Sequence, residues 1–404
     1  MSAKRVSKKA IAIGLSAVIL GLAGGSLMRA YLGGEDFSGE IEAVASCAAK
    51  GSVIECARPI VADMLQTHSA AEVMNALSAM PLSGDQCHFI GHLVGQETYQ
   101  KDGTTEAALA ECSRTCGLAC IHGVIGEAFT EETALDETAV DPAHLTADQL
   151  VEIGTRLCTS SSTCHGVGHA LVIGATSTAD AVTAALPLCA RIASGKFAAD
   201  CYSGVFMEYS DELASRSVFA TTTAAYPSLA SLRTFCDRSD IKQAQACFLY
   251  LPAMLEYTLG AQGADDSRAA VSSTTLSICN GEANPLTRTA CIAGFGASYF
   301  EHLTTDRTTV VDACEQFPTA GDREACAFGA IGMAAPYKES GPMLSFCSAL
   351  SGSSVQKACY EESFSRLALF GVPTTTAARS CPNDQACLDA AASPADPYDA
   401  LFTR

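Results

Sequence analysis

The stretch CARIASGKFAADC at residues 189–201, continued by YSGVF at 202–206, shows the unit from which this chain is built. Eleven residues lie between its two cysteines. Three other cysteine pairs have the same gap and a fourth has a gap of ten: Cys279 with Cys291, Cys314 with Cys326, Cys347 with Cys359, and Cys236 with Cys247. Such regular spacing indicates a duplicated unit with one disulfide in each copy.

The second cysteines of successive units follow one another at steps of 33 to 46 residues, a period typical of helical-hairpin repeats. Residues 181–192 and 344–350 are predicted as first helices, and the segments after the second cysteines as their partners, because the apolar runs lack the alternation of strands. The sequence therefore predicts an all-α fold over residues 41–372, in which disulfide-stapled helical hairpins form an α-solenoid or an α/α toroid.

Each predicted hairpin has short side chains and buries little apolar surface, so a cross-link between its helices has a clear physical role. In the loop-entropy model, a closed ring of about 13 residues contributes roughly 3 kcal/mol to the free energy of unfolding. In four units, glycine follows the second cysteine by three residues and allows neighbouring helices to approach closely: Gly123, Gly204, Gly294 and Gly329. Shorter disulfides are predicted elsewhere, the last of them in a Pro- and Thr-rich tail over 373–404: Cys47 with Cys56, Cys158 with Cys164, and Cys381 with Cys387.

One disulfide inside each helical hairpin resembles the disulfide-tied SEL1-like and tetratricopeptide-like solenoids, such as the cysteine-rich secreted proteins of Helicobacter. The resemblance covers residues 41–372 and concerns the architecture. It implies a superhelical surface that interacts with another protein, and it carries over no functional residue.

The first 40 residues predict the compartment. Four basic residues within 1–9 precede an uncharged run over 10–28, which Arg29 closes. At about 1.5 Å per residue this run crosses a hydrocarbon core of roughly 30 Å, and the positive-inside rule places the basic segment in the cytoplasm. We therefore expect a single-pass signal anchor in the inner or plasma membrane, a linker over 29–40, and a periplasmic or extracellular domain. A signal peptide cleaved near Ala23-Gly24-Gly25 is the alternative.

The composition excludes several classes of protein. A chain of 404 residues with 48% hydrophobic and 17% charged residues is not a disordered acidic chain. Its 25 basic against 44 acidic residues argue against a nucleic-acid partner. The sequence contains no Gly-x-Ser-x-Gly elbow, no phosphate loop and no complete dinucleotide fingerprint, so no nucleotide cofactor is expected. Its 20 cysteines agree with export to an oxidising compartment.

Five of the eight histidines follow the repeat cysteines of three successive units: His88 and His92, then His122, then His165 and His169. Two histidines four residues apart lie on one face of a helix, which is an arrangement that binds transition metals. The sequence therefore predicts a metal site of these five residues, with copper, zinc or iron as the metal. Ligands from three helices also allow a dinuclear centre. Non-covalent haem, a structural histidine cluster and an acid-base site without metal are the other interpretations.

Further residues near the histidines could complete a coordination shell or orient an imidazole: Glu97, Glu127, Glu208, Cys112 and Cys116. The two cysteines are included because four cysteines of the first two histidine units do not fit the simple pairing scheme: Cys87, Cys112, Cys116 and Cys120. Two more disulfides, with three connectivities open, are one interpretation. Thiolate ligands or a redox-active pair are the other.

These features together predict a membrane-anchored, exported protein whose repeats over 41–180 form the metal site and whose repeats over 181–372 act as scaffold. If the protein is an enzyme, metal-dependent redox chemistry is expected, because the ligands are largely imidazole and no separate nucleophile is evident. The alternative function is a non-catalytic scaffold whose repeat surface binds another envelope protein.

Overall fold

The computed structural model describes residues 38–47, 53–80, 82, 84–134, 146–173, 179–193, 197–219, 227–261, 267–300, 302–337, 340–381 and 384–392, and these residues form helices and no strand. The all-α prediction is confirmed for this part of the chain. The predicted anchor over 10–28 lies outside it. Among the described helices, none combines the length and the hydropathy that a membrane span requires.

The chain folds into successive helical hairpins. The first helices are α2 (Ser38–Cys47), α4 (Ala70–Ser78), α6 (Thr105–Glu111), α8 (Ala147–Leu157), α10 (Ala179–Ile192), α12 (Leu229–Cys236), α14 (Ser267–Gly281), α17 (Arg307–Glu315) and α19 (Ser340–Ala349). The second helices are α3 (Val53–Met64), α5 (Gly84–Asp102), α7 (Ala119–Ala134), α9 (Ser161–Ile173), α11 (Ala198–Phe219), α13 (Ile241–Ala261), α15 (Pro285–Ala297), α18 (Ala320–Ala334) and α20 (Ser353–Leu369). Short elements complete the fold: η1 (Cys116–Leu118), α16 (His302–Thr305), η3 (Ala335–Tyr337), α21 (Thr374–Ala377), η4 (Ala378–Ser380) and α22 (Gln385–Ala392).

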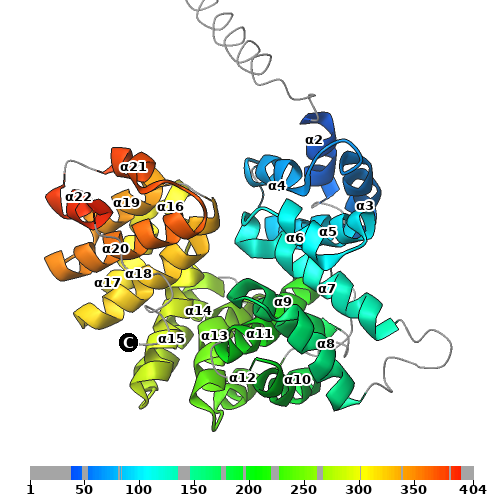
Figure 1. Ribbon diagram of the computed structural model, residues 1–404. Helices are drawn as coiled ribbons and strands as arrows, with labels where there is room; N and C mark the ends of the chain where they lie inside the picture. Colours follow the sequence, from blue (N-terminus) through cyan, green and yellow to red (C-terminus); the bar gives the residue numbers. More distant parts are fainter. Residues whose placement is uncertain are drawn as a thin grey trace, which may run out of the picture.

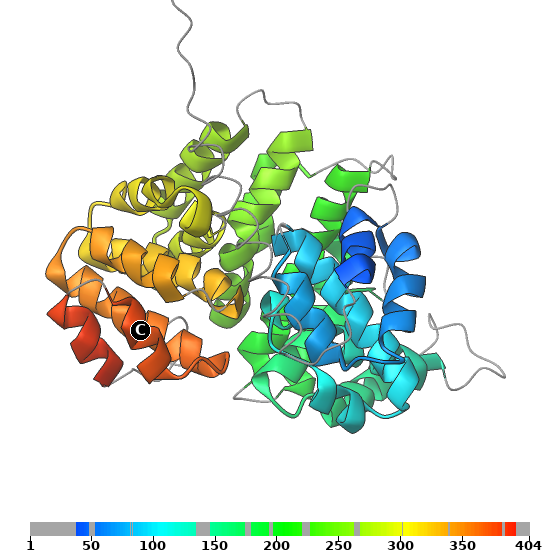
Figure 2. The same ribbon diagram turned by 90° about the horizontal axis from the view of Figure 1, so that it is seen from above.

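The second helices from α5 to α20 form one continuous layer, in which each second helix packs against the next second helix. Helix α22 continues this layer by packing against α20. The first helices flank this layer, and α8, α10 and α12 follow one another along the lower edge of Figure 1. Because each hairpin is turned relative to the previous one, the chain follows an arc from the blue N-terminal hairpins through green to the red C-terminal helices (Figures 1 and 2).

The arc is bent far enough to bring early and late hairpins into contact. Arg114, which precedes α7, donates a hydrogen bond from Nη1 to the backbone oxygen of Leu369 at the end of α20, at 3.0 Å and across 255 residues of sequence. The turns η1 and η3 also pack against each other. The solenoid therefore curves toward the toroidal form that the sequence left as an alternative.

Disulfides link the two helices of most hairpins, as predicted. The five regularly spaced pairs and the three shorter pairs are confirmed. The remaining four cysteines form the bridges Cys87–Cys116 and Cys112–Cys120. Because no cysteine is free, the interpretation of Cys112 and Cys116 as thiolate ligands is wrong: a disulfide sulfur is not the thiolate that metals bind.

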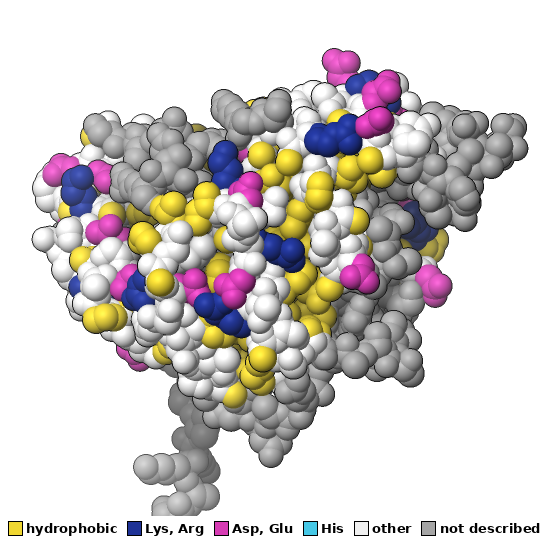
Figure 3. Space-filling view, turned by 90° about the horizontal axis from the view of Figure 1, so that it is seen from below, with side chains coloured by type: hydrophobic (Ala, Val, Ile, Leu, Met, Phe, Trp, Pro, Cys, Tyr) yellow, Lys and Arg dark blue, Asp and Glu magenta, His cyan; other side chains and the backbone are white. Residues whose placement is uncertain are grey.

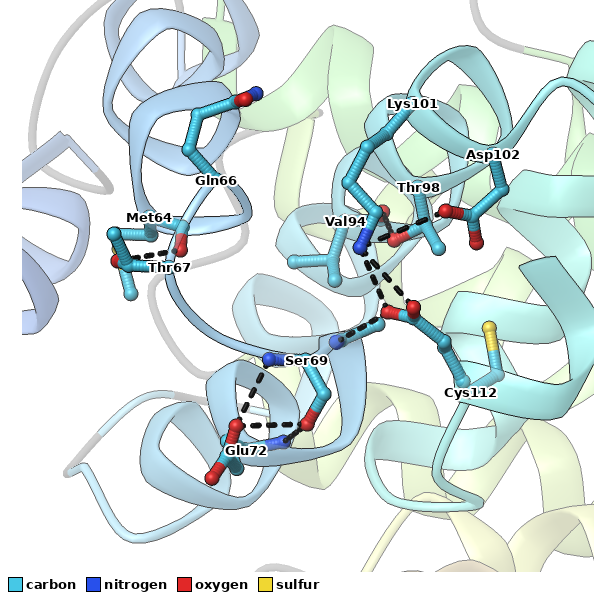
Figure 4. Close-up of polar contacts among 12 residues, drawn as sticks. Met64, Gln66, Thr67, Ser69, Glu72, Val94, Thr98, Lys101, Asp102 and Cys112 are labelled. Atoms are coloured by element: carbon cyan, nitrogen blue, oxygen red, sulfur yellow. Dashed lines mark hydrogen bonds and ion pairs between the residues drawn. The ribbon is translucent and has the colours of Figure 1, made fainter. Parts of the chain in front are cut away.

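Polar contacts fix the position of α5, which carries two of the histidines. The Ser69 side chain caps α4 by accepting from the backbone N–H of Glu72, whose carboxylate accepts from the N–H of Ser69. The Lys101 ammonium on α5 donates to both oxygens of Glu111 on α6, at 3.1 and 3.0 Å (Figure 4). Glu111 also accepts from the N–H of Ala70 at 3.4 Å. One carboxylate thus joins α4, α5 and α6.

The described part of the predicted tail caps the solenoid. Helix α22 packs against α20, and the Tyr360 hydroxyl donates to Asp384 at 2.7 Å just before α22 begins. The Cys381–Cys387 bridge closes this segment. The last second helix is therefore covered on the side that has no further repeat to pack against.

The surface of the repeats shows no single dominant charge on the face seen from below. In Figure 3, apolar side chains on this face are interspersed with Lys, Arg, Asp and Glu. The net charge of -19 is therefore not concentrated on this face as one acidic patch.

Candidate metal centre

Close helix crossings bring the histidines of three hairpins together. On α7, a Cβ added at Gly123 would lie 2.0 Å from the backbone oxygen of His92 on α5. On α11, a Cβ added at Gly204 would lie 2.0 Å from the backbone oxygen of His165 on α9. Real Cβ atoms do not approach an oxygen so closely, so only glycine permits these crossings. The predicted role of the glycines in helix packing is confirmed, and Gly294 and Gly329 make equivalent approaches.

The five predicted histidines form one group, called here the histidine cluster: His88 and His92 on α5, His122 on α7, and His165 and His169 on α9. Neighbouring ring centroids lie 4.5 Å apart for His88 and His92, 4.7 Å for His122 and His165, and 5.0 Å for His165 and His169. The cluster is joined across hairpins as well, since His92 lies 5.4 Å from His169. Equivalent positions in successive repeats thus converge on one place.

The cluster contains two overlapping sets of three nitrogen donors. In the first triad, of His88, His92 and His122, one ligand atom from each residue lies within 4.8 Å of the others. The second triad, of His122, His165 and His169, meets the same limit. His122 therefore belongs to both triads, and the arrangement has room for one metal ion or for two.

Hydrogen bonds through Nδ1 orient two of the imidazoles. His88 donates from Nδ1 to the backbone oxygen of Cys116 at 2.9 Å, and His169 donates from Nδ1 to Glu208 at 2.9 Å. The carbonyl accepts only, which fixes the proton of neutral His88 on Nδ1. In each ring Nε2 then carries the lone pair that a metal would bind, and this is how metal-binding histidines are usually oriented.

Three histidines of the cluster have buried ring nitrogens that make no hydrogen bond. Both ring nitrogens of His122, and Nε2 of His92 and His88, are buried without a hydrogen-bond partner. A buried polar atom without a partner costs about 1–3 kcal/mol. Three residues of one cluster with this defect indicate that the group is arranged for a ligand rather than for the stability of the metal-free protein.

Burial keeps the cluster uncharged. Desolvation lowers the pKa of His88 to about 4, against a smaller opposite effect of its hydrogen bond to Cys116, and lowers the pKa of His165 to about 3. Desolvation and the neighbouring imidazoles hold the pKa values of His92, His122 and His169 well below the usual 6.5. Neutral imidazole is the form that binds metals, so the ligands need not lose a proton at neutral pH.

These pKa shifts predict acid destabilisation of the metal-free protein. The unfolded chain takes up protons below pH 6.5 but folded His88 does so only near pH 4, so the free energy of unfolding falls as the pH drops through this window. For His88 alone the loss is about 3 kcal/mol. Denaturant titrations between pH 7.5 and 4.5 should show a smaller fall in H88L than in wild type. Equal falls would contradict the assignment of His88 as a buried neutral residue.

The five histidines are not equally buried. His88, His122 and His169 are 6%, 3% and 1% exposed, whereas His92 and His165 are half-buried. The rings of His88, His122 and His169 are therefore the most enclosed part of the cluster.

Of the three predicted glutamates, the structure brings one to the cluster. Glu208, on α11, orients His169. Glu97 instead forms an ion pair with Arg58, and Glu127 accepts from Gln100 at 2.9 Å. Glu97 follows His92, and Glu127 follows His122, by five residues, which on a helix is a turn of about 140° away from the histidine face. Both glutamates thus have other partners, and neither is among the described groups of converging ligand atoms.

Two residues near the cluster are absent from the sequence prediction. Met207 places Sδ 3.3 Å from Nε2 of His165. Asp211 places Oδ2 3.9 Å from Nε2 of His88, and with His169 and Glu208 it forms a third set of ligand atoms within 4.8 Å. Both residues lie on α11 in the fourth unit, whose repeat cysteine has no histidine after it. The signal available in the sequence was their position, six and ten residues after Cys201.

Comparisons of the chain with protein-family models, with curated proteins and with solved structures give no match. The resemblance to SEL1-like solenoids stays an expectation from the sequence.

Proposed function

We propose that this protein binds transition metal ions in its histidine cluster. The observation that carries the proposal is the convergence of five neutral imidazoles from three helices, with buried nitrogens that have no partner in the protein. The spacing supports it further: Nε2 of His165 and Nε2 of His169 are 3.2 Å apart, and two ligands on one tetrahedral ion, each about 2.0–2.1 Å from it, are separated by about 3.3–3.4 Å.

The donor set favours copper, zinc or iron ions over haem. Imidazole suits these metals, and the carboxylates of Glu208 and Asp211 would place negative charge beside the bound cation. The imidazole rings lie in mutual contact, with neighbouring centroids about 5 Å apart, which leaves no layer between them for a flat macrocycle. Non-covalent haem is therefore the weaker form of the proposal.

The proposed chemistry is redox chemistry at the bound metal. Bound copper or iron would supply one-electron transfer. In the chain itself, Glu208 fixes the orientation of His169 and increases its basicity, and the low exposure of His88, His122 and His169 shields the metal from bulk water. All cysteines are paired in disulfides, which agrees with a domain that functions in an oxidising compartment outside the cytoplasm. In this proposal, residues 10–28 hold the domain at the inner or plasma membrane.

Metal titration of the purified full chain tests the proposal. The H122L/H165A/H169A variant, which leaves neither triad complete, should lose most of its uptake of copper and zinc, measured by inductively coupled plasma mass spectrometry after desalting, and most of the metal-induced rise in melting temperature. H68A is the matched control, because His68 is half-buried and lies outside the cluster. Equal uptake by wild type and the triple variant would exclude the cluster as the binding site.

A second candidate function is a scaffold that binds another envelope protein. It is favoured by the unbroken layer of second helices from α5 to α22, since stacked helical repeats present extended surfaces to partners. It predicts no dependence on metal. A protein that takes up no copper, zinc or iron and whose melting temperature ignores all three would favour the scaffold.

A further inference from the structure

Met207 occupies a position that the proposed metal site leaves unexplained. Its Sδ atom lies 3.3 Å from Nε2 of His165, and the same Nε2 lies 3.2 Å from Nε2 of His169. Nε2 of His165 thus lies within hydrogen-bond distance of both a sulfur and a second imidazole nitrogen. Met207, like His165, is half-buried.

The protonation of the two rings leaves at most one hydrogen among the three polar atoms of this contact. Because His169 donates from Nδ1 to Glu208, its Nε2 carries a lone pair in the neutral ring. The thioether of Met207 also offers only a weak acceptor. A single N–H on His165 therefore faces two acceptors, and a cation would satisfy all three donor atoms at once.

The thioether also resolves the competition for His122. That residue belongs to both triads, so two ions would have to share it if imidazoles were the only ligands. With Met207 as the third ligand beside His165 and His169, His122 is left to complete the first triad with His88 and His92. The cluster then provides two separate sets of three ligands. The set that contains the thioether sulfur is the softer of the two.

We propose that His165, His169 and Met207 form a copper site that selects Cu(I), an inference that rests on the proposed function. His88, His92 and His122 form a neighbouring all-imidazole site in this proposal. Thioether sulfur is a soft ligand that favours Cu(I), whereas imidazole alone also suits zinc. No cysteine is free to supply a competing thiolate. The sulfur of Met207 is therefore the element of the site that distinguishes copper from zinc.

The test measures Cu(I) affinity by anaerobic competition with bicinchoninate, with ascorbate as reductant so that the disulfides remain closed. At the site that contains His165 and His169, M207L should bind Cu(I) about tenfold or more weakly than wild type. Its zinc affinity should stay within about twofold of the wild-type value. M254L is the control, because Met254 is fully buried in α13 outside the cluster and Met-to-Leu exchange is well tolerated in cores.

X-ray absorption at the copper edge gives an independent readout. The Cu(I)-loaded wild type and M254L should show a sulfur neighbour, which can only be a thioether, and M207L should show nitrogen neighbours alone. Unchanged Cu(I) affinity and an unchanged spectrum in M207L, together with loss of binding in H165A/H169A, would overturn the role of Met207 and keep the proposed function. Unchanged binding in H122L/H165A/H169A would overturn both.

Discussion

G123A is expected to lower the free energy of unfolding by about 3 kcal/mol or more, and to separate α5 from α7. The new Cβ would lie 2.0 Å from the backbone oxygen of His92 and 2.8 Å from its carbonyl carbon. Backbone atoms cannot turn aside as a side chain can, so the two helices must move apart. His92 and His122 would then move apart with them, and metal uptake by the first triad should fall.

G126A on the same helix is the matched control for this substitution. A Cβ at Gly126 meets nothing within 4 Å, and alanine has the higher helix propensity, so this variant should be more stable by about 0.5–1 kcal/mol. Denaturant unfolding followed by far-UV circular dichroism measures both. If G123A and G126A have the same stability, then the close crossing of α5 and α7 is not part of the folded protein.

H122L is expected to have opposite effects on stability and on metal binding. Both ring nitrogens of His122 are buried without a hydrogen-bond partner, and burial already holds its pKa well below the usual value. An apolar side chain of similar size removes that cost, so the metal-free variant should be more stable than wild type by about 1–3 kcal/mol. The same change removes a ligand, so zinc should no longer raise the melting temperature through the first triad.

Higher stability without metal, together with a lost response to zinc, distinguishes a metal site from a structural histidine cluster. A structural histidine would lose stabilising contacts on substitution, and H122L would then unfold at lower denaturant concentration with or without zinc. The measurement is a pair of denaturant titrations, in chelator and in excess zinc, for wild type and H122L. H68L serves as the control for a histidine outside the cluster. A less stable H122L that keeps its full response to zinc would contradict the assignment.

The fold was largely predictable because cysteine spacing reports helical geometry directly. Two cysteines with eleven residues between them, such as Cys189 and Cys201, suit a hairpin in which one helix ends, a short turn follows and the next helix begins. The cysteines around η1 were not assignable in this way. The bridge from Cys87 to Cys116 links different hairpins, and the backbone has positive φ at Cys116, Gly117 and Leu118, a local geometry that spacing does not encode.

The histidine cluster was predictable for a related reason. His88 and His165 each follow a repeat cysteine by one residue, so packing of successive second helices brings them near a common point. Glu208 was predicted as well, but Met207 and Asp211 were not, because their contribution depends on how far α11 is rotated against α9. Gly204 allows the close approach of these two helices, and no repeat position marks Met207 or Asp211.

The metal content of the full chain, produced with copper and zinc in the medium and purified without chelator, tests the central claim most directly. Mass spectrometry of the wild type should find close to one ion for each of the two ligand sets, and a variant combining H122L with H165A and H169A should retain almost none. Wild-type protein without bound transition metal, or with the same content as this variant, would contradict the account.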